Sequence, residues 1–214
     1  MEMIRTVAKA WNIPDIRKKI IFTLVMLLIF RIGSQIPVPG IDRDILAQTF
    51  DSGTGLFALF NLFSGGAFSN FTIFALSITP YITASIILQL LTIAVPSLER
   101  LAKEGTEGRK KIAQYTRYLT VILAIIQAIG VSVGLFRQAL LSDKFYDVAL
   151  IVLVLTAGTA FLMWLGEQIN EYGIGNGISL IIFAGIVSRL PSAVQEIWTK
   201  LQDGSMSIVT LIIF

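Results

Sequence analysis

Residues 56–95 read LFALFNLFSGGAFSNFTIFALSITPYITASIILQLLTIAV, forty consecutive positions without a charged side chain. A helix rises about 1.5 Å per residue and the hydrocarbon core of a bilayer is about 30 Å thick, so one span needs about 20 apolar residues. The stretch is about twice that length and must be interrupted. Glycine and proline loosen or end helices, which predicts breaks at Ser64-Gly65-Gly66, Ser69-Asn70 and Thr79-Pro80.

The segments on either side of the two glycines differ in length. Residues 56–63 form a short aromatic-rich segment, whereas about 71–91 is long enough for a complete span. One interpretation is a half-helix joined by a flexible link to a complete helix, which is tolerated only inside protein or beside a water-filled cavity. The other is an amphipathic helix lying on the membrane surface. The segment by itself does not separate the two.

The composition of the whole chain agrees with a membrane protein. Hydrophobic residues make up 55% of the 214 positions and charged residues 14%, against about 25% charged in an ordinary soluble domain. Uncharged tracts alternate with short polar connections, as in bundles of spanning helices. We therefore expect an all-α, polytopic membrane helix bundle.

The other apolar tracts predict spans at about 20–36, 118–136, 148–165 and 177–190, and a sixth span that starts near Met206. The chain then divides into a cytoplasmic amphipathic lead-in (1–19), a first span with an outer loop (20–55), the short segment (56–70), spans two to five (71–205) and the start of span six (206–214). Polar connections are expected at 99–117 and 167–176. Arg31, near the end of span one, is expected to snorkel to the interface.

The positions of Lys and Arg predict the orientation. With the N-terminus inside, eleven basic residues lie on the inner side, five before span one and six between spans two and three, and six lie at outer positions. This excess predicts a cytoplasmic N-terminus. The connection at 167–176 disagrees, because it should be cytoplasmic but carries Glu167 and Glu171 and no basic residue.

Several kinds of chemistry are excluded or disfavoured. The chain has no cysteine and no histidine, so it offers no thiol or imidazole catalyst and no histidine-based metal site. No acidic residue lies in the middle of a predicted span, although ion-coupled transporters usually place one there. We expect no catalytic residue, metal or cofactor. Neutral polar groups inside the spans either line a wet path or bond neighbouring helices; they are Ser77, Thr79, Gln89, Gln127 and Thr159.

Two pairs of isoleucines flank the predicted breaks. Ile78 and Ile82 are four residues apart around Pro80, and Ile178 and Ile182 are four apart after the run of glycines at 173–177. Glycines in this run allow close backbone approach. Each pair occupies one helix face. Apolar rings of this kind gate pores by excluding water. Spacing alone favours ordinary packing or lipid contact.

Longer motifs then resemble the SecY family, bacterial subunits of the Sec protein-translocation channel. The resembling segments follow one another along nearly the whole chain: RIGS (31–34), IPVPGID (36–42), FNLFSGGA (60–67), IFALSITPYITASIILQLL (73–91), EGTEGRKKIAQYTRY (104–118), MWLGEQI (163–169) and GIGNGIS (173–179).

The resemblance implies the N-terminal half of a ten-span channel built from two inverted halves. Such a channel passes secretory polypeptides across the membrane and membrane segments laterally into lipid. It would place Ile78, Ile82, Ile178 and Ile182 in the pore ring. It implies a plug that contains Phe60, Asn61, Phe63, Ser64, Gly65 and Gly66. Lateral-gate candidates are Thr83, Ile86, Ile87, Ile126 and Gln127, each of which equally fits ordinary helix packing.

The same resemblance implies a bacterial plasma-membrane location and a set of partners. These are small SecE-like and SecG-like membrane subunits, a ribosome or a SecA-like ATPase motor at the cytoplasmic face, signal peptides and nascent polypeptides, and the lipid bilayer. A secondary transporter with broken helices is the alternative function, and an intramembrane hydrolase lacks its nucleophile, base or metal ligands.

Overall fold

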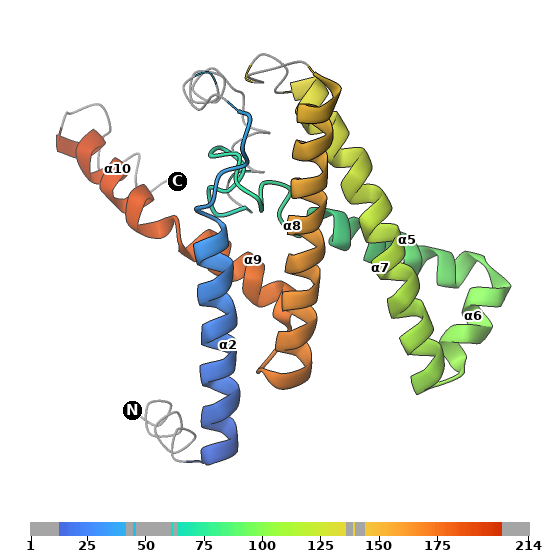
Figure 1. Cartoon of the computed structure of the whole chain (residues 1–214). Coiled ribbons are helices and arrows are strands. Elements are labelled where there is room, and N and C mark those ends of the chain that lie inside the picture. Colours follow the sequence, from blue (N-terminus) through green and yellow to red (C-terminus); the bar gives the residue numbers. More distant parts are fainter. Residues whose placement is uncertain are drawn as a thin grey trace.

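The computed structural model describes residues 13–41, 45, 61, 64–135, 139 and 144–202. Apart from an isolated bridge between Pro37 and Thr72, these residues form helices and turns, so the fold is an all-α membrane helix bundle. Its elements are α2 (Pro14–Gly33), α5 (Thr79–Ala94), α6 (Pro96–Lys103), α7 (Thr106–Ile129), the π-helix η1 (Gly130–Leu135), α8 (Phe145–Tyr172), α9 (Gly177–Val187) and α10 (Leu190–Gln202) (Figure 1).

Two helical stretches in the described residues are long and apolar enough to cross a membrane alone, Thr106–Gly134 and Phe145–Tyr172. A third span results if the bent pair α5 and α6 is counted as one. The first of these stretches covers predicted span three up to Gly134, and the second contains predicted span four. Helix α9, at 11 residues, is shorter than the predicted fifth span, and the predicted sixth span lies outside the described residues.

The predicted helix from Phe71 is wrong at its start, because α5 begins at Thr79. Residues 64–78 instead form consecutive turns. Their backbone bonds to the end of the first span: the Val38 amide donates to the Phe71 carbonyl at 3.0 Å, and the Ile73 amide donates to the Ile36 carbonyl at 3.0 Å. These long-range bonds replace the helical ones.

The connection predicted at 99–117 is wrong as a loop, because it is largely helical. Helix α6 follows α5 after a 101° bend at Val95, where Pro96 has no amide hydrogen to continue the helix. Gly105 then turns the chain with φ +77°, and α7 returns along α6. Gly108 makes this return possible, since a Cβ there would lie 1.7 Å from the Leu101 carbonyl oxygen.

The connection predicted at 167–176 is shorter than expected. Helix α8 continues to Tyr172, so that only residues 173–176 join it to α9. Helix α2 likewise begins at Pro14, inside the predicted lead-in. Helix α10 was not predicted at all.

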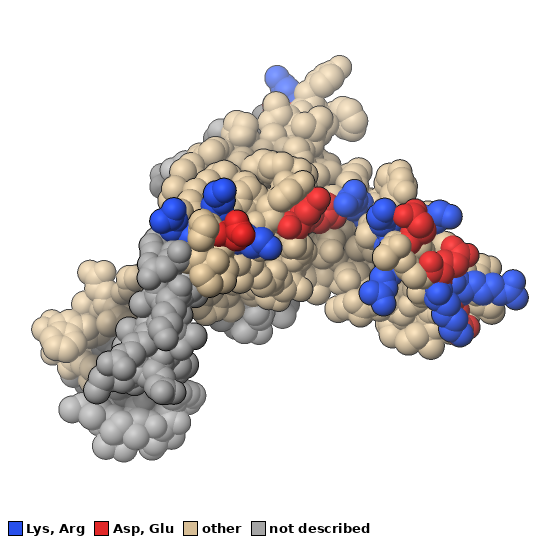
Figure 2. All heavy atoms as spheres, turned by 90° about the horizontal axis from the view of Figure 1, so that it is seen from below, with Lys and Arg blue, Asp and Glu red and all other residues tan. Residues whose placement is uncertain are grey.

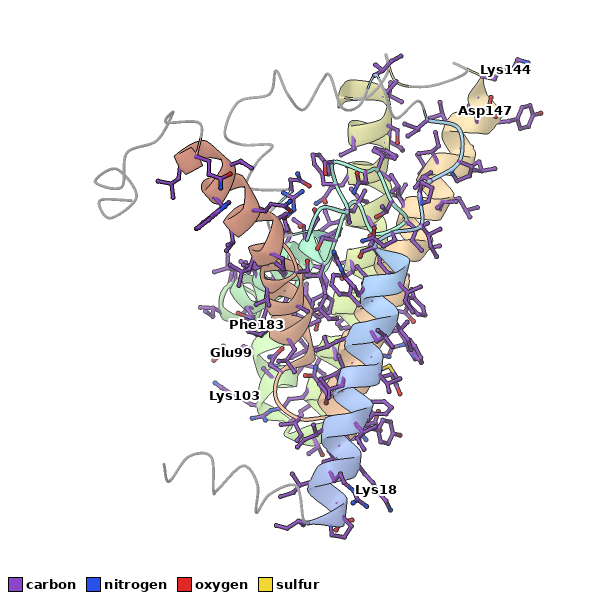
Figure 3. The ribbon with its side chains drawn as sticks, turned by 90° about the vertical axis from the view of Figure 1, so that its left-hand side faces the viewer. Lys18, Glu99, Lys103, Lys144, Asp147 and Phe183 are labelled. Carbon is purple, nitrogen blue, oxygen red and sulfur yellow. The ribbon has the colours of Figure 1, made fainter. Side chains whose placement is uncertain are left out.

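Charged residues gather at the two ends of the helices. Figure 3 shows Lys18 at one end and Lys144 with Asp147 at the opposite end. Figure 2 views the end that carries the start of α2, where basic and acidic side chains form a row. Near the end of α8 that is opposite Lys144, Arg117 Nε donates to Glu167 Oε1 at 2.7 Å. The acidic connection that seemed to contradict the orientation therefore lies on the same face as the basic segment.

Candidate functional site

The four isoleucines singled out in the sequence come together in one apolar cluster. Ile78 is fully buried, with 1% of its surface exposed. Ile82, Ile178 and Ile182 are half-buried and pack on the same group of side chains. We call these four residues the isoleucine cluster. Ile78 and Ile82 lie at the start of α5, and Ile178 and Ile182 lie in α9. The buried group that they share includes Phe30 of α2 and Leu162, Leu165 and Ile169 of α8.

The late start of α5 positions its two isoleucines. Ser77 adopts a left-handed backbone with φ +54°, and Ile78 is the N-cap of the helix. Pro80 follows in the first turn, where a missing amide hydrogen costs nothing. Ile82 lies one turn later and its amide bonds back to the Ile78 carbonyl at 3.1 Å. Non-glycine residues in this backbone region concentrate at functional sites.

Glycines position the other two isoleucines, as the sequence predicted for the run at 173–177. A Cβ on Gly177 would lie 2.1 Å from the Gly166 carbonyl oxygen of α8. The two helix backbones therefore touch. Asn170 Oδ1 accepts from the Gly177 amide at 2.7 Å, and Asn176 Oδ1 caps α9 by accepting from the Ser179 amide at 3.2 Å.

Residues 64–66 form a tight turn, here called the glycine turn, with φ +63° at Gly65 and +90° at Gly66. The turn contacts the end of α9. A Cβ on Gly65 would lie 2.9 Å from the Gly185 Cα. The next residue, Ala67, is fully buried in the same apolar group as Ile78. The glycine turn and the isoleucine cluster are thus continuous.

Asn61 joins the same structure from before the turn. Its carbonyl oxygen accepts from the Gly66 amide at 3.0 Å and its Oδ1 accepts from the Ser69 amide at 3.1 Å. Ser64 Oγ accepts from the Phe68 amide at 3.0 Å. The predicted plug residues Asn61, Ser64, Gly65 and Gly66 are therefore brought together, whereas Phe60 and Phe63 lie outside the described residues.

Two arginines border the glycine turn, and the sequence had suggested neither contact. Arg31 Nη1 donates to the Gly65 carbonyl at 3.2 Å. Arg189 also lies beside the turn, because a Cβ on Gly66 would be 3.2 Å from its Nη2. A basic residue near the end of an apolar helix was the only available signal, and it does not identify the partner.

The lateral-gate candidates lie on two helices that pack together, α5 and α7. Ile86 and Ile126 are exposed, at 51% and 59%. Thr83 Oγ1 donates to the Thr79 carbonyl at 3.0 Å, and Ile87 is half-buried. Gln127 lines a cavity of about 320 Å³ together with Ser77 and Thr79.

The chemistry available at the site is apolar. The isoleucine cluster presents branched alkyl groups, and in the described residues no group of three or more acidic side chains is arranged to hold a metal ion. Branched alkyl groups exclude water and bind no particular solute.

Residues 72–214 match the family model for SecY. The chain belongs to the SecY family. SecY proteins with curated descriptions as protein translocase subunits are similar over nearly all of it. The SecY of Halalkalibacterium halodurans is 53% identical over 206 residues, which is 94% of this chain and 47% of that protein. The SecY of Escherichia coli is 49% identical over 210 residues, again 94% and 47%. The chain thus spans about half the length of the SecY proteins it matches.

Solved structures share the fold. A structure of a protein-conducting channel superimposes with a TM-score of 0.65 and 24% identity, over 91% of this chain and 43% of that one. Sec61 in a canine ribosome–channel complex from the endoplasmic reticulum gives a TM-score of 0.67 at 24% identity, over 91% and 43%. At these identities the similarity shows that the SecY fold is shared.

Proposed function

We propose that this chain forms the N-terminal half of the pore subunit of a protein-conducting channel, which passes secretory polypeptides across the bacterial plasma membrane and releases membrane segments into lipid. The observation that carries the proposal is the convergence of Ile78, Ile82, Ile178 and Ile182 from two separately interrupted helices into one apolar cluster. The chain acts in this channel as a conduit and not as an enzyme.

The isoleucine cluster serves as part of a seal. A channel for arbitrary polypeptide sequences cannot use charged selectivity groups, because they would hold some substrates and reject others. Branched alkyl side chains exclude water when the pore is empty and yield to a chain that passes. The glycine turn is the part of the plug that rests on this seal, since Ala67 belongs to the same apolar group as Ile78.

The side exit lies beside α5 and α7. In our proposal the exposed Ile86 and Ile126 face a part of the channel supplied by the remaining half, and Thr83, Ile87 and Gln127 border that contact. The opening between these surfaces is where a hydrophobic segment would leave for the bilayer.

The proposed assembly includes further components. We propose SecE-like and SecG-like membrane subunits, a ribosome or SecA-like ATPase motor at the cytoplasmic face, and signal peptides and nascent chains as substrates. The N-terminus is cytoplasmic in this arrangement. Support comes from the pairing of Arg117 with Glu167, which unites the basic and acidic segments on one face.

The test replaces all four isoleucines of the cluster with serine in a complete channel that contains this sequence. The resting membrane is expected to leak ions, because hydroxyl groups allow water to fill the constriction. Planar-bilayer conductance measures the effect. The matched control changes two exposed residues, Leu153→Ser and Phe183→Ser, at 68% and 61% exposure.

Unchanged resting conductance in the fourfold variant, with normal assembly, would reject the sealing role. The comparisons favour a channel over a secondary transporter, since the matched relatives are translocase subunits. Ion flux that required a small solute, with no passage of an unfolded polypeptide, would instead support the transporter.

A further inference from the structure

The glycine turn contacts two helices that are far apart in the sequence. On one side Arg31, in the last turn of α2, donates from Nη1 to the Gly65 carbonyl at 3.2 Å. On the other side the Gly65 backbone rests on Gly185 near the end of α9. The turn therefore bridges two helices that are separated by about 150 positions in the sequence.

The contact with α9 depends on small size and not on a bond. A Cβ on Gly65 would lie 2.9 Å from the Gly185 Cα, 3.0 Å from its carbonyl oxygen and 3.2 Å from Ser188 Oγ. The surfaces match closely, but such contacts are individually weak. The hydrogen bond from Arg31 is the directional attachment between α2 and the turn.

The chemistry of Arg31 suits a releasable attachment. Its guanidinium also lies 3.5 Å from Ser34 Oγ, and Ser34 Oγ donates to the Arg31 carbonyl at 2.7 Å, so the end of α2 is ordered around it. Charge-assisted hydrogen bonds are roughly twice as strong as neutral ones. A bond of this kind attaches the turn to α2, and moving the turn away from α2 breaks it.

Arg189 adds the second feature. Its guanidinium lies against Gly66, so two cations lie beside one turn. Two like charges that approach each other repel, and the turn between them supplies the carbonyl that Arg31 uses. If the turn moves away, Arg31 loses the Gly65 carbonyl as its acceptor. Arg189 cannot replace it, because an arginine side chain has no acceptor atom.

We propose that Arg31 is a positioning residue that latches the glycine turn over the isoleucine cluster and so holds the channel closed at rest. This inference rests on the proposed function and assigns the closed state to a particular bond. Arg31 acts through the Gly65 carbonyl.

The test follows the burial of Ala67 in a complete channel. Ala67 is 0% exposed while the turn is seated, and this sequence has no cysteine. Ala67→Cys, in a channel without other cysteines, reports seating through its reaction with a membrane-impermeant maleimide added outside. Arg31→Leu is expected to raise the labelling rate about 10- to 100-fold, the effect of losing a hydrogen bond to a charged group. Arg31→Lys, which keeps a cationic donor, is expected to restore most of the protection.

A second reporter separates a latch from general loosening. Ser132 in η1 is also 0% exposed and lies outside the glycine turn. With Ser132→Cys as the reporter, Arg31→Leu is expected to leave the labelling rate unchanged. Equal acceleration at both reporters, or at neither, overturns the latch. If Arg31→Leu does not assemble, Arg31→Gln is read by the same two criteria.

Resting conductance of the fourfold isoleucine variant is measured alongside. If that variant leaks while Arg31→Leu and Arg31→Gln leave Ala67→Cys protected, only the latch is wrong. If the isoleucine variant does not leak, the proposed function is wrong regardless of the labelling result.

Discussion

Gly177 is the residue on which the position of α9 depends most directly. Its added Cβ would lie 2.1 Å from the Gly166 carbonyl oxygen and 2.9 Å from the Ile169 Cβ. Gly166 also has no room for a side chain, because a Cβ there would lie 2.6 Å from Ile178 Cδ1. The two glycines bring α9 against α8 and thereby place Ile178 in the isoleucine cluster.

Gly177→Ala is therefore expected to push α9 away from α8 and to lower the free energy of unfolding by about 1–3 kcal/mol, the usual cost of overpacking. Thermal unfolding of the purified channel in detergent measures the loss. Gly130→Ala is the control, because a Cβ at Gly130 meets nothing within 4 Å. Equal stability of the two variants would contradict the close contact between the helices.

At the scale of elements, α7 is the helix that joins the others. It packs along α5 and along α8, and its buried positions beyond Gly108 are small residues four apart, Thr116, Thr120, Ala124 and Ala128. Small residues allow helix backbones to approach closely in a membrane. The two threonine hydroxyls donate to carbonyls one turn earlier, at 3.0 and 2.7 Å, so that they add no unpaired donor.

Ala124→Leu is expected to separate α7 from its neighbours, because Ala124 is 0% exposed and has no room for three further carbon atoms. We expect a loss of about 1–3 kcal/mol in the free energy of unfolding and a lower yield of assembled channel, measured by size-exclusion chromatography. Ile125→Leu, at a 40% exposed neighbour, serves as the control and should be neutral. A stable Ala124→Leu variant would mean that α7 does not pack as described.

At the scale of the whole molecule, the two ends of the bundle belong to opposite sides of the membrane. The pairing of Arg117 with Glu167 connects α7 and α8 at one end, and Lys144 with Asp147 lies at the other (Figure 3). The orientation remains a prediction, since the excess of basic residues at the first end favours the cytoplasm.

Single cysteines test this arrangement in sealed vesicles of known sidedness. Lys111→Cys and Glu171→Cys are expected to react only with a reagent supplied on the cytoplasmic side, and Tyr146→Cys only with one supplied outside. All three positions are exposed in the structure. Reaction of Lys111→Cys and Glu171→Cys from different sides would contradict the fold itself, whereas reversal of all three would contradict only the orientation.

The apolar tracts of the sequence by themselves determined the fold class and the approximate position of most helices, because a bilayer requires long uncharged segments whose backbone groups bond within a helix. The central parts of spans three and four were predicted correctly for this reason. The glycines at 173–177 also predicted a close backbone approach, since few other residues permit one. The spacing of four isoleucines was insufficient, and their convergence required the structure.

The tertiary structure alone decided where α5 begins, how α6 folds back on α7, and what Arg31 binds. The first and the last depend on groups far apart in the chain, because the backbone of 71–73 bonds to 36–38 and Arg31 meets Gly65. The second depends on the close contact of Gly108 with the Leu101 carbonyl of the preceding helix. The helix or turn propensity of a short segment carries no information about the residues that it contacts in the folded chain. A basic residue near a helix end predicts a polar neighbour, and only the folded chain determines that this neighbour is the carbonyl of a turn.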